Sequence, residues 1–412
     1  MKVMFCNVPW YGDSWHGIKA GSRWPFIFNT PKPPEESLGN YNAYPFFLAY
    51  AAQYLHSAKV GDIAFYDALA RSHTYDTFYK NVQAMYPDIV VIETSTPSID
   101  NDLTVAKEIN SRFGCEIALS GTHATVYADE LIKHDYIKYV LQGEYEVGAY
   151  EMCLMRTKGV YKCRPVQNID NLLPVRDKLN YFYGDGFGHA DKLQWPQLQV
   201  WTSRGCPYPC TFCLWRNTMT YGNYRKRTMT NVLKEINYCV REFGFKSVLL
   251  DDDTVNIGDD RTVDVAKHMD TLNMEWHAMV RPDACSWSAF EDMKRYGCKG
   301  LKMGIESFSQ NGLNYIKKGY DKNKVIETVD FLASCGFLIF MSMMDNIPTE
   351  TEEDKIETAK WIKYFTAKGV QIQHPTCMPL PGTELFNKLD NEGKINKSDW
   401  KQFGCFHGEV IK

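Results

Sequence analysis

Three cysteines lie close together near the middle of the chain, at Cys206, Cys210 and Cys213. Their spacing is C-x3-C-x2-C, and they follow the apolar, strand-like segment 198–201, so we expect them in a loop at a strand end. A structural zinc site is closed by four ligands, and a simple electron-transfer iron–sulfur site also takes four cysteines. No fourth cysteine follows until Cys239. Three thiolates on a four-iron cluster leave one iron open to another ligand, so the motif predicts chemistry rather than a structural staple.

The chain around this motif alternates between short apolar strands and helical stretches. We expect six strand–helix repeats, which suit a partial TIM-type barrel, and active sites of such barrels lie at the carboxyl ends of the strands. The predicted strands are 198–203, 247–250, 276–280, 300–305, 338–343 and 370–374.

The cysteine loop after a first barrel strand resembles the signature of radical S-adenosylmethionine (SAM) enzymes. The resemblance implies that Cys206, Cys210 and Cys213 bind a 4Fe–4S cluster whose open iron is chelated by the amino and carboxylate groups of SAM. It also implies that electron transfer from the cluster cleaves SAM to a 5′-deoxyadenosyl radical.

Charged residues follow the next three predicted strands. The three adjacent carboxylates at 251–253 repel one another, and a cationic ligand facing them would offset this repulsion. The alternative is an ordinary acidic cluster in a turn or at the start of a helix. The resemblance implies that Asp252 or Asp253 contacts the SAM amino group, without resolving which, and that Glu306, in a G-x-E-S motif, contacts the ribose or amino group. Arg281 offers a bidentate donor suited to a carboxylate, with a surface salt bridge as the alternative.

The first 155 residues also alternate between strands and helices, which predicts a Rossmann-like, doubly wound parallel sheet. Ligands on such sheets bind beyond the carboxyl ends of the strands. The predicted strands are 2–7, 62–67, 88–93, 115–120 and 136–141.

Small and polar residues occupy the loops after three of these strands. Glycine and hydroxyl residues let a bulky polar ligand approach the backbone, but they are also common in ordinary turns. Together the loops resemble the cobalamin-binding domain that precedes some radical SAM barrels, with its G-x-H-A-T and G-E-x-E motifs. The resemblance implies cobalamin contacts by Ser95, Ser98, Gly121, Thr122, His123, Thr125, Gly143 and Glu144.

Two features depart from related cobalamin domains. The D-x-H-x-x-G motif that places a histidine on cobalt is absent, so we predict no histidine ligand to cobalt. Phe47 stands where the related motif more usually has glycine. The aromatic and proline-rich segment 11–39 is too long for a simple turn and is interpreted as either a cofactor-covering lid or a solvated loop.

These patterns predict four regions. They are a cobalamin-binding domain at 1–155, a linker at 156–195, a radical SAM barrel at 196–385 and a short tail at 386–412.

Bulk composition limits the class of protein. The net charge of −4 shows no basic excess, which argues against nucleic acid as a partner. No apolar run approaches the roughly 18 residues of a membrane span. The 13 cysteines are odd in number and scattered, which argues against a disulfide framework and for the reducing cytoplasm.

The resemblance therefore implies a cobalamin-dependent radical SAM enzyme that methylates an unactivated carbon by way of a 5′-deoxyadenosyl radical and methylcobalamin. The expected partners are a small-molecule or peptide substrate and a flavodoxin- or ferredoxin-type electron donor. One alternative is a cyclisation, rearrangement or oxidation without methyl transfer. A second is a non-catalytic cobalamin or redox sensor.

Overall fold

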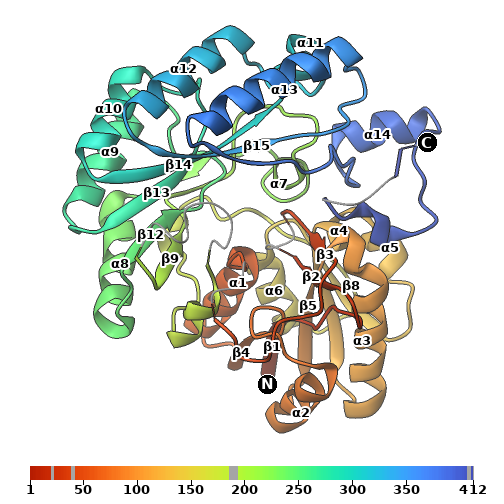
Figure 1. The fold of residues 1–412 in the computed structure, drawn as a ribbon. Helices are drawn as coiled ribbons and strands as arrows, with labels where there is room; N and C mark the ends of the chain where they lie inside the picture. The colour runs from red at the N-terminus through yellow and green to blue at the C-terminus, as the bar shows by residue number, and fades with distance from the viewer. Residues whose placement is uncertain (20–22, 39–41, 185–193, 406–409, 412) are drawn as a thin grey trace. The chain divides into compact units, whose positions relative to one another are not determined.

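The computed structural model describes residues 1–19, 23–38, 42–184, 194–405 and 410–411. The chain divides into two compact units. The first contains Met1–Tyr183, Cys213–Tyr221 and Met378–Lys412, and the second contains Gly184–Phe212 and Gly222–Cys377. Each unit is built around its own parallel sheet (Figure 1).

The first unit contains a six-stranded parallel sheet in the order β4-β1-β5-β6-β7-β8. The predicted doubly wound sheet is thus confirmed. After β1 the chain adds β4 on one side and then returns to add β5 on the other, so the strand order reverses between β1 and β5. The strands are β1 (Lys2–Asn7), β4 (Asp62–Asp67), β5 (Ile89–Thr94), β6 (Glu116–Gly121), β7 (Ile137–Gln142) and β8 (Gly159–Lys162).

Helices cover both faces of this sheet (Figure 1). Along β5, Val90 and Ile92 belong to a hydrophobic core with α2 (Tyr75–Met85) and α3 (Ile99–Phe113). The helices α1 (Phe46–Ser57) and α6 (Tyr145–Met155) pack together on the opposite face. Shorter elements complete the unit: β2 (His16–Ile18), β3 (Phe26–Phe28), η2 (Thr96–Ser98), α4 (Thr122–Val126), α5 (Ala128–Leu131), η3 (Ile169–Asn171), η4 (Lys178–Phe182), α7 (Leu214–Thr218), α14 (Glu384–Asn391) and η5 (Trp400–Phe403).

The second unit contains six parallel strands in strict sequence order, β9-β12-β13-β14-β15-β16. This is the strand order of the predicted partial barrel. The strands are β9 (Gln197–Val200), β12 (Ser247–Leu250), β13 (Glu275–Val280), β14 (Cys298–Glu306), β15 (Leu338–Met343) and β16 (Gln371–Gln373), with a short antiparallel pair β10 (Ser203–Arg204) and β11 (Arg225–Lys226).

The helices between these strands lie on the outer side of the sheet (Figure 1). Their ends follow local rules: Thr228 caps α8 by accepting the Asn231 N–H, and Gly244 ends it with a φ of 76° that favours glycine. The helices are α8 (Met229–Phe243), α9 (Asp259–Asp270), α10 (Trp287–Arg295), α11 (Gln310–Tyr315), α12 (Lys322–Ser334) and α13 (Glu352–Ala367).

The region between the two predicted domains differs from a simple linker. Residues 159–162 pair with β7 and add a sixth strand to the first sheet. Part of the predicted linker, 185–193, lies outside the described residues, as do residues 20–22 of the predicted lid segment. Across the described part of the chain, no helix has the length and apolarity needed to cross a bilayer.

Candidate functional site

The entry to the cysteine loop is fixed by a buried carboxylate. Asp252, just beyond β12, has no exposed surface. Its Oδ1 accepts the Thr202 N–H at 2.7 Å, and its Oδ2 accepts the Thr202 hydroxyl at 2.6 Å and the Ser203 hydroxyl. Burial raises the pKa of Asp252. The Asp252 carboxylate therefore forms hydrogen bonds within the protein, and these bonds join the ends of β9 and β12.

The partly exposed Asp253 lies nearer the thiols. Burial, followed by the negative charge of Asp253, raises the pKa of Cys206. The Cys206 sulfur also lies 3.7 Å from the Thr254 hydroxyl oxygen. Asp253 is thus the carboxylate of this run that lies beside the cysteine loop.

None of the three motif cysteines forms a disulfide. Cys210 is buried, whereas Cys206 and Cys213 are partly exposed. Cys213 immediately precedes α7, in a segment that belongs to the first unit. Within the described residues, no three His, Cys, Asp or Glu side chains are gathered closely enough to hold one metal ion. The motif predicts a cluster of several iron atoms, which does not need its ligands gathered around a single ion.

Arg281 contacts the cysteine loop directly. Its Nη1 lies 3.9 Å from the Cys210 sulfur, within hydrogen-bonding range for sulfur. Its Nε and Nη2 both donate to the Asp283 carboxylate at 3.0 Å, and Nη2 also donates to the Lys318 carbonyl at 2.9 Å. Because a guanidinium has five N–H groups, these contacts leave one for another ligand. In the structure the bidentate edge of Arg281 pairs with Asp283, and its contact with a SAM carboxylate stays a prediction.

Glu306 ends β14 in a backbone conformation that is unusual for a side chain. Its φ is 71°, in the left-handed region, where a non-glycine residue is strained. The side chain is buried, and its Oε1 accepts the Lys318 ammonium at 2.7 Å. Burial opposes the charge on Lys318, but the Glu306 carboxylate raises the pKa of Lys318 above its ordinary value. The predicted SAM contact is thus held in place by a buried cation.

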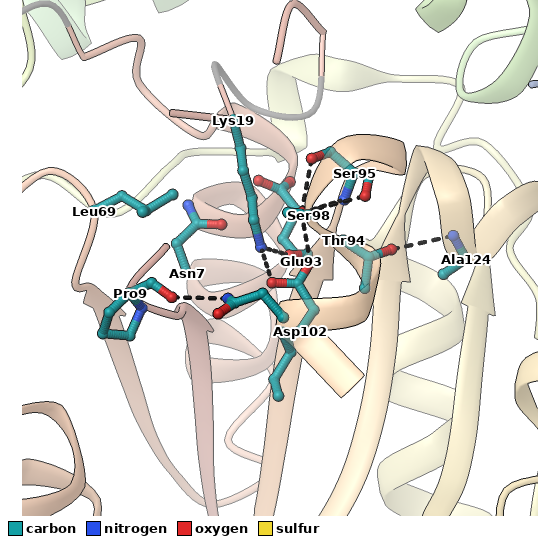
Figure 2. A network of polar contacts seen from close by, with 12 residues as sticks. Asn7, Pro9, Lys19, Leu69, Glu93, Thr94, Ser95, Ser98, Asp102 and Ala124 are labelled. Carbon is teal, nitrogen blue, oxygen red and sulfur yellow. Dashed lines mark hydrogen bonds and ion pairs between the residues drawn. The ribbon is translucent and has the colours of Figure 1, made fainter. Parts of the chain in front are cut away.

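The loops of the first unit meet at the carboxyl ends of β5, β6 and β7. The Thr94 hydroxyl donates to the Ser120 carbonyl at 2.7 Å. It also accepts the Ala124 N–H at 3.1 Å (Figure 2). Gly121 has a φ of 101°, and a Cβ at this position would lie 2.2 Å from the Thr94 carbonyl oxygen. Only glycine therefore allows the backbones to approach this closely.

The next loop is tied to the same strand end. The Thr125 hydroxyl donates to the Gly121 carbonyl at 2.8 Å and accepts the Gly143 N–H at 3.0 Å. Thr122 and Glu144 are buried beside these residues. The structure thus brings together the G-x-H-A-T and G-E-x-E motifs, which lie 18 residues apart at the hydrogen bond that joins them.

His123 does not behave as an ordinary titrating histidine. It is buried, and burial lowers its pKa to about 3. Its Nδ1 lies 3.2 Å from the Thr96 hydroxyl, and its ring packs against Tyr127 and Trp400. The ring is therefore neutral at physiological pH and held by contacts within the first unit.

Ser95 and Ser98 belong to a buried network that is completed by Lys19 (Figure 2). The Ser98 hydroxyl donates to Asp102 Oδ2 at 2.7 Å, and the two serine hydroxyls lie 2.8 Å apart. Lys19 donates to Asp102 Oδ1 at 2.9 Å and to the Glu93 carbonyl. Lys19 and Asp102 are at most 1% exposed, so their opposite charges compensate each other inside the protein.

Two buried acceptors lie at the point where the strand order reverses. Asn7 and Glu93 directly follow the paired residues Cys6 and Ile92 on β1 and β5. Glu93 Oε1 accepts the Tyr145 hydroxyl at 3.0 Å, whereas Glu93 Oε2 and Asn7 Oδ1 have no hydrogen-bond partner among the described residues. Burial raises the pKa of Glu93 to about 7.

Phe47 is buried on the α1 face of the first sheet. Its ring lies 5.8 Å from that of Tyr145 and 5.1 Å from that of Trp215. The side chain that replaces the more usual glycine therefore fills space between α1, α6 and α7.

Sequence reasoning missed Lys19, Asp102 and Lys318. Each becomes notable only through a buried, oppositely charged partner that is distant in sequence, and a lone Lys or Asp carries no such signal. The single hint was the position of Lys19 in the long segment 11–39.

A parallel partial barrel whose first strand leads into a three-cysteine loop defines the class of radical SAM enzymes. Residues 201–362 match the model of the radical SAM superfamily. The chain therefore contains a radical SAM domain, and its fold is like that of the solved cobalamin-dependent radical SAM enzymes, as the sequence predicted.

Curated relatives span most of the chain at low identity. An uncharacterized methyltransferase of Pyrococcus horikoshii is 27% identical over 87% of this chain and 81% of its own. The hopanoid C-3 methylase of Methylococcus capsulatus is 23% identical over 85% and 72%. The anaerobic magnesium-protoporphyrin IX monomethyl ester cyclase of Rubrivivax gelatinosus is 21% identical over 98% and 72%.

Two solved structures share the fold. The methyltransferase TsrM from Kitasatospora setae, with cobalamin and a 4Fe–4S cluster bound, gives a TM-score of 0.69 at 12% identity, covering 95% of this chain and 75% of its own. OxsB, with aqua-cobalamin and SAM bound, gives 0.67 at 13% identity. This chain is covered fully by the match but spans only 64% of OxsB.

Proposed function

We propose that this protein is a cobalamin-dependent radical SAM methyltransferase acting on an unactivated carbon of a small molecule or peptide. The observation that carries the proposal is the C-x3-C-x2-C loop at the end of the first barrel strand, inside the region that matches the radical SAM superfamily. The named activities of the methylase and methyltransferase relatives support methyl transfer. We also propose that the protein acts in the cytoplasm and receives electrons from a flavodoxin- or ferredoxin-type donor.

The residues of the cysteine loop and its neighbours fit an iron–sulfur cluster with SAM. Three thiols without disulfide partners supply soft ligands, and the Arg281 N–H lies within reach of one sulfur. Asp253, beside the loop, is the carboxylate of the acidic run that we assign to the SAM amino group. The cluster and SAM together supply a carbon-centred radical when bound.

The residues of the first unit fit a ligand rich in hydrogen-bond donors. In parallel sheets ligands bind where the strand order reverses, which here is the edge between β1 and β5. The buried oxygens Asn7 Oδ1 and Glu93 Oε2 lie at this position, and no donor among the described residues bonds to them. The carboxamide groups of cobalamin are such donors. Ser95 and Ser98 follow β5 at this position, and Thr125 joins the loops after β6 and β7.

One observation favours a second function. The magnesium-protoporphyrin IX monomethyl ester cyclase aligns with nearly all of this chain, and its name describes ring formation rather than methylation. A cyclisation or oxidation would use the same cysteine loop.

The two functions are distinguished by the products of SAM. The protein is reconstituted anaerobically with iron, sulfide and cobalamin, SAM and a low-potential reductant are added, and both products are quantified by mass spectrometry. Methyl transfer predicts S-adenosylhomocysteine together with 5′-deoxyadenosine. 5′-Deoxyadenosine alone supports the cyclase class, and the absence of both, with the cluster intact, contradicts both functions.

A further inference from the structure

The Arg281 guanidinium is contacted by a carboxylate and by two aromatic rings. One edge of the fork, Nε and Nη2, faces the Asp283 carboxylate at 3.0 Å. The Tyr208 ring centroid lies 3.6 Å from the guanidinium carbon, and that of Tyr320 lies 4.6 Å away. A planar cation held between aromatic rings and a bidentate carboxylate has little freedom to rotate. The remaining edge, Nη1, is thereby directed at the Cys210 sulfur.

The segment that follows α11 holds both this arginine and the cysteine loop. The Ile316 carbonyl accepts the Thr211 N–H at 3.0 Å, one residue after Cys210. The Lys318 carbonyl accepts from Arg281 at 2.9 Å. The Lys318 ammonium lies 5.7 Å from the Phe212 ring centroid, inside the same loop. The loop, Arg281 and segment 316–320 are thus joined into one rigid assembly.

In this assembly the positive charge of Arg281 faces the Cys210 sulfur, whereas the negative charge of Asp283 does not. Arg281 is buried and its Nη1 edge faces Cys210, whereas the Asp283 carboxylate lies on the opposite edge and is partly exposed. Lys318 adds a second buried cation, although Glu306 compensates it. Hydrogen bonds to cluster sulfurs and nearby charge are two of the levers that set iron–sulfur reduction potentials.

We propose that Arg281 is a positioning residue of the iron–sulfur site, which orients the Cys210 ligand and raises the reduction potential of the cluster through its N–H contact and its charge. The inference rests on the proposed function in one respect, namely that the loop holds a four-iron cluster. Reduction adds one negative charge to the cluster, so a cation beside a ligand sulfur stabilises the reduced form.

Two substitutions, each of which removes one charge, test the sign of this effect. Arg281→Gln removes the cation and its sulfur contact, whereas Asp283→Asn removes the anion and leaves the cation. Each anaerobically reconstituted variant is titrated with dithionite and redox mediators without SAM, and the reduced cluster is quantified by electron paramagnetic resonance. We expect Arg281→Gln to lower the ratio of reduced to oxidised cluster about tenfold at fixed potential, or about 59 mV for one electron. Asp283→Asn is expected to raise it.

Two further variants separate this role from a general loss of structure. Arg281→Lys keeps the charge without the planar fork and is expected to fall between the wild type and Arg281→Gln. Arg227→Gln removes another buried arginine of the same unit, which pairs with Glu235, and is expected to leave the potential unchanged. Unchanged potentials in Arg281→Gln and Asp283→Asn, or shifts of the same sign, overturn the inference. A wild-type protein without any four-iron cluster instead refutes the proposed function, and the inference falls with it.

Discussion

The buried carboxyl of Glu93 is expected to make the stability of the first unit depend on pH. The side chain has no exposed surface, and burial raises its pKa from 4.5 to about 7. Since its folded pKa is higher than its unfolded value, the folded state binds the proton more tightly. The stabilisation from the neutral form is therefore complete below pH 4.5 and is lost as the pH rises through about 7. The loss amounts to about 3 kcal/mol at 1.36 kcal/mol per pKa unit.

Glu93→Gln removes this titration while keeping the size of the side chain and an oxygen that can accept the Tyr145 hydroxyl. We expect the variant to gain about 3 kcal/mol over the wild type at pH 8 and almost nothing near pH 4.5. The measurement is hydrogen exchange by mass spectrometry on peptides covering β5, because opening of one unit need not be two-state for the whole chain.

Glu108→Gln serves as the matched control, since this carboxylate on α3 is half-exposed in the same unit. Its pH profile is expected to follow that of the wild type. Parallel pH profiles for the wild type and Glu93→Gln would refute the reasoning, because the buried carboxyl would then contribute no linked proton.

Two further substitutions test the buried contacts of the first unit. Lys19→Met leaves the Asp102 carboxylate buried without its cation and is expected to cost about 3–5 kcal/mol in denaturant unfolding. Lys80→Met breaks an exposed pair and should cost far less, so equal costs would contradict a buried charge network. Gly121→Ala places a Cβ 2.2 Å from a carbonyl oxygen at positive φ and is expected to destabilise by more than about 1 kcal/mol. Gly159→Ala meets no atom within 4 Å and is expected to be neutral, which a thermal melt of both variants checks.

Much of the fold could be predicted because the strands of both sheets are continuous apolar runs. Asp62–Asp67 and Leu338–Met343 begin and end where the sequence predicted. β8 was missed because the edge strand Gly159–Lys162 is short and half-exposed, so it lacks the apolar run of a central strand. Helix α10 lies where the strand–helix alternation predicted a helix, but its bounds were not predicted, although Ser286 caps its first turn.

The candidate site was predictable in its residue types but not in its pairings. The sequence marks the cysteine loop and the charged strand ends. It gives no indication that the Asp252 carboxylate accepts hydrogen bonds from Thr202 and Ser203. It also cannot show that Arg281 pairs with Asp283, since that depends on side-chain direction at a strand end. The Asp252 contacts join segments that lie 50 residues apart in the sequence, so tertiary packing rather than local pattern sets them.

We propose that Cys206, Cys210 and Cys213 hold a four-iron cluster with one iron open to SAM, and every other step depends on this cluster. The most direct test is electron paramagnetic resonance of the reduced, reconstituted protein before and after SAM is added, with the triple Cys→Ala variant alongside. We predict a four-iron signal that shifts on addition of SAM and is absent from the triple variant. A signal that SAM leaves unchanged, or one that survives loss of the three cysteines, would contradict the claim.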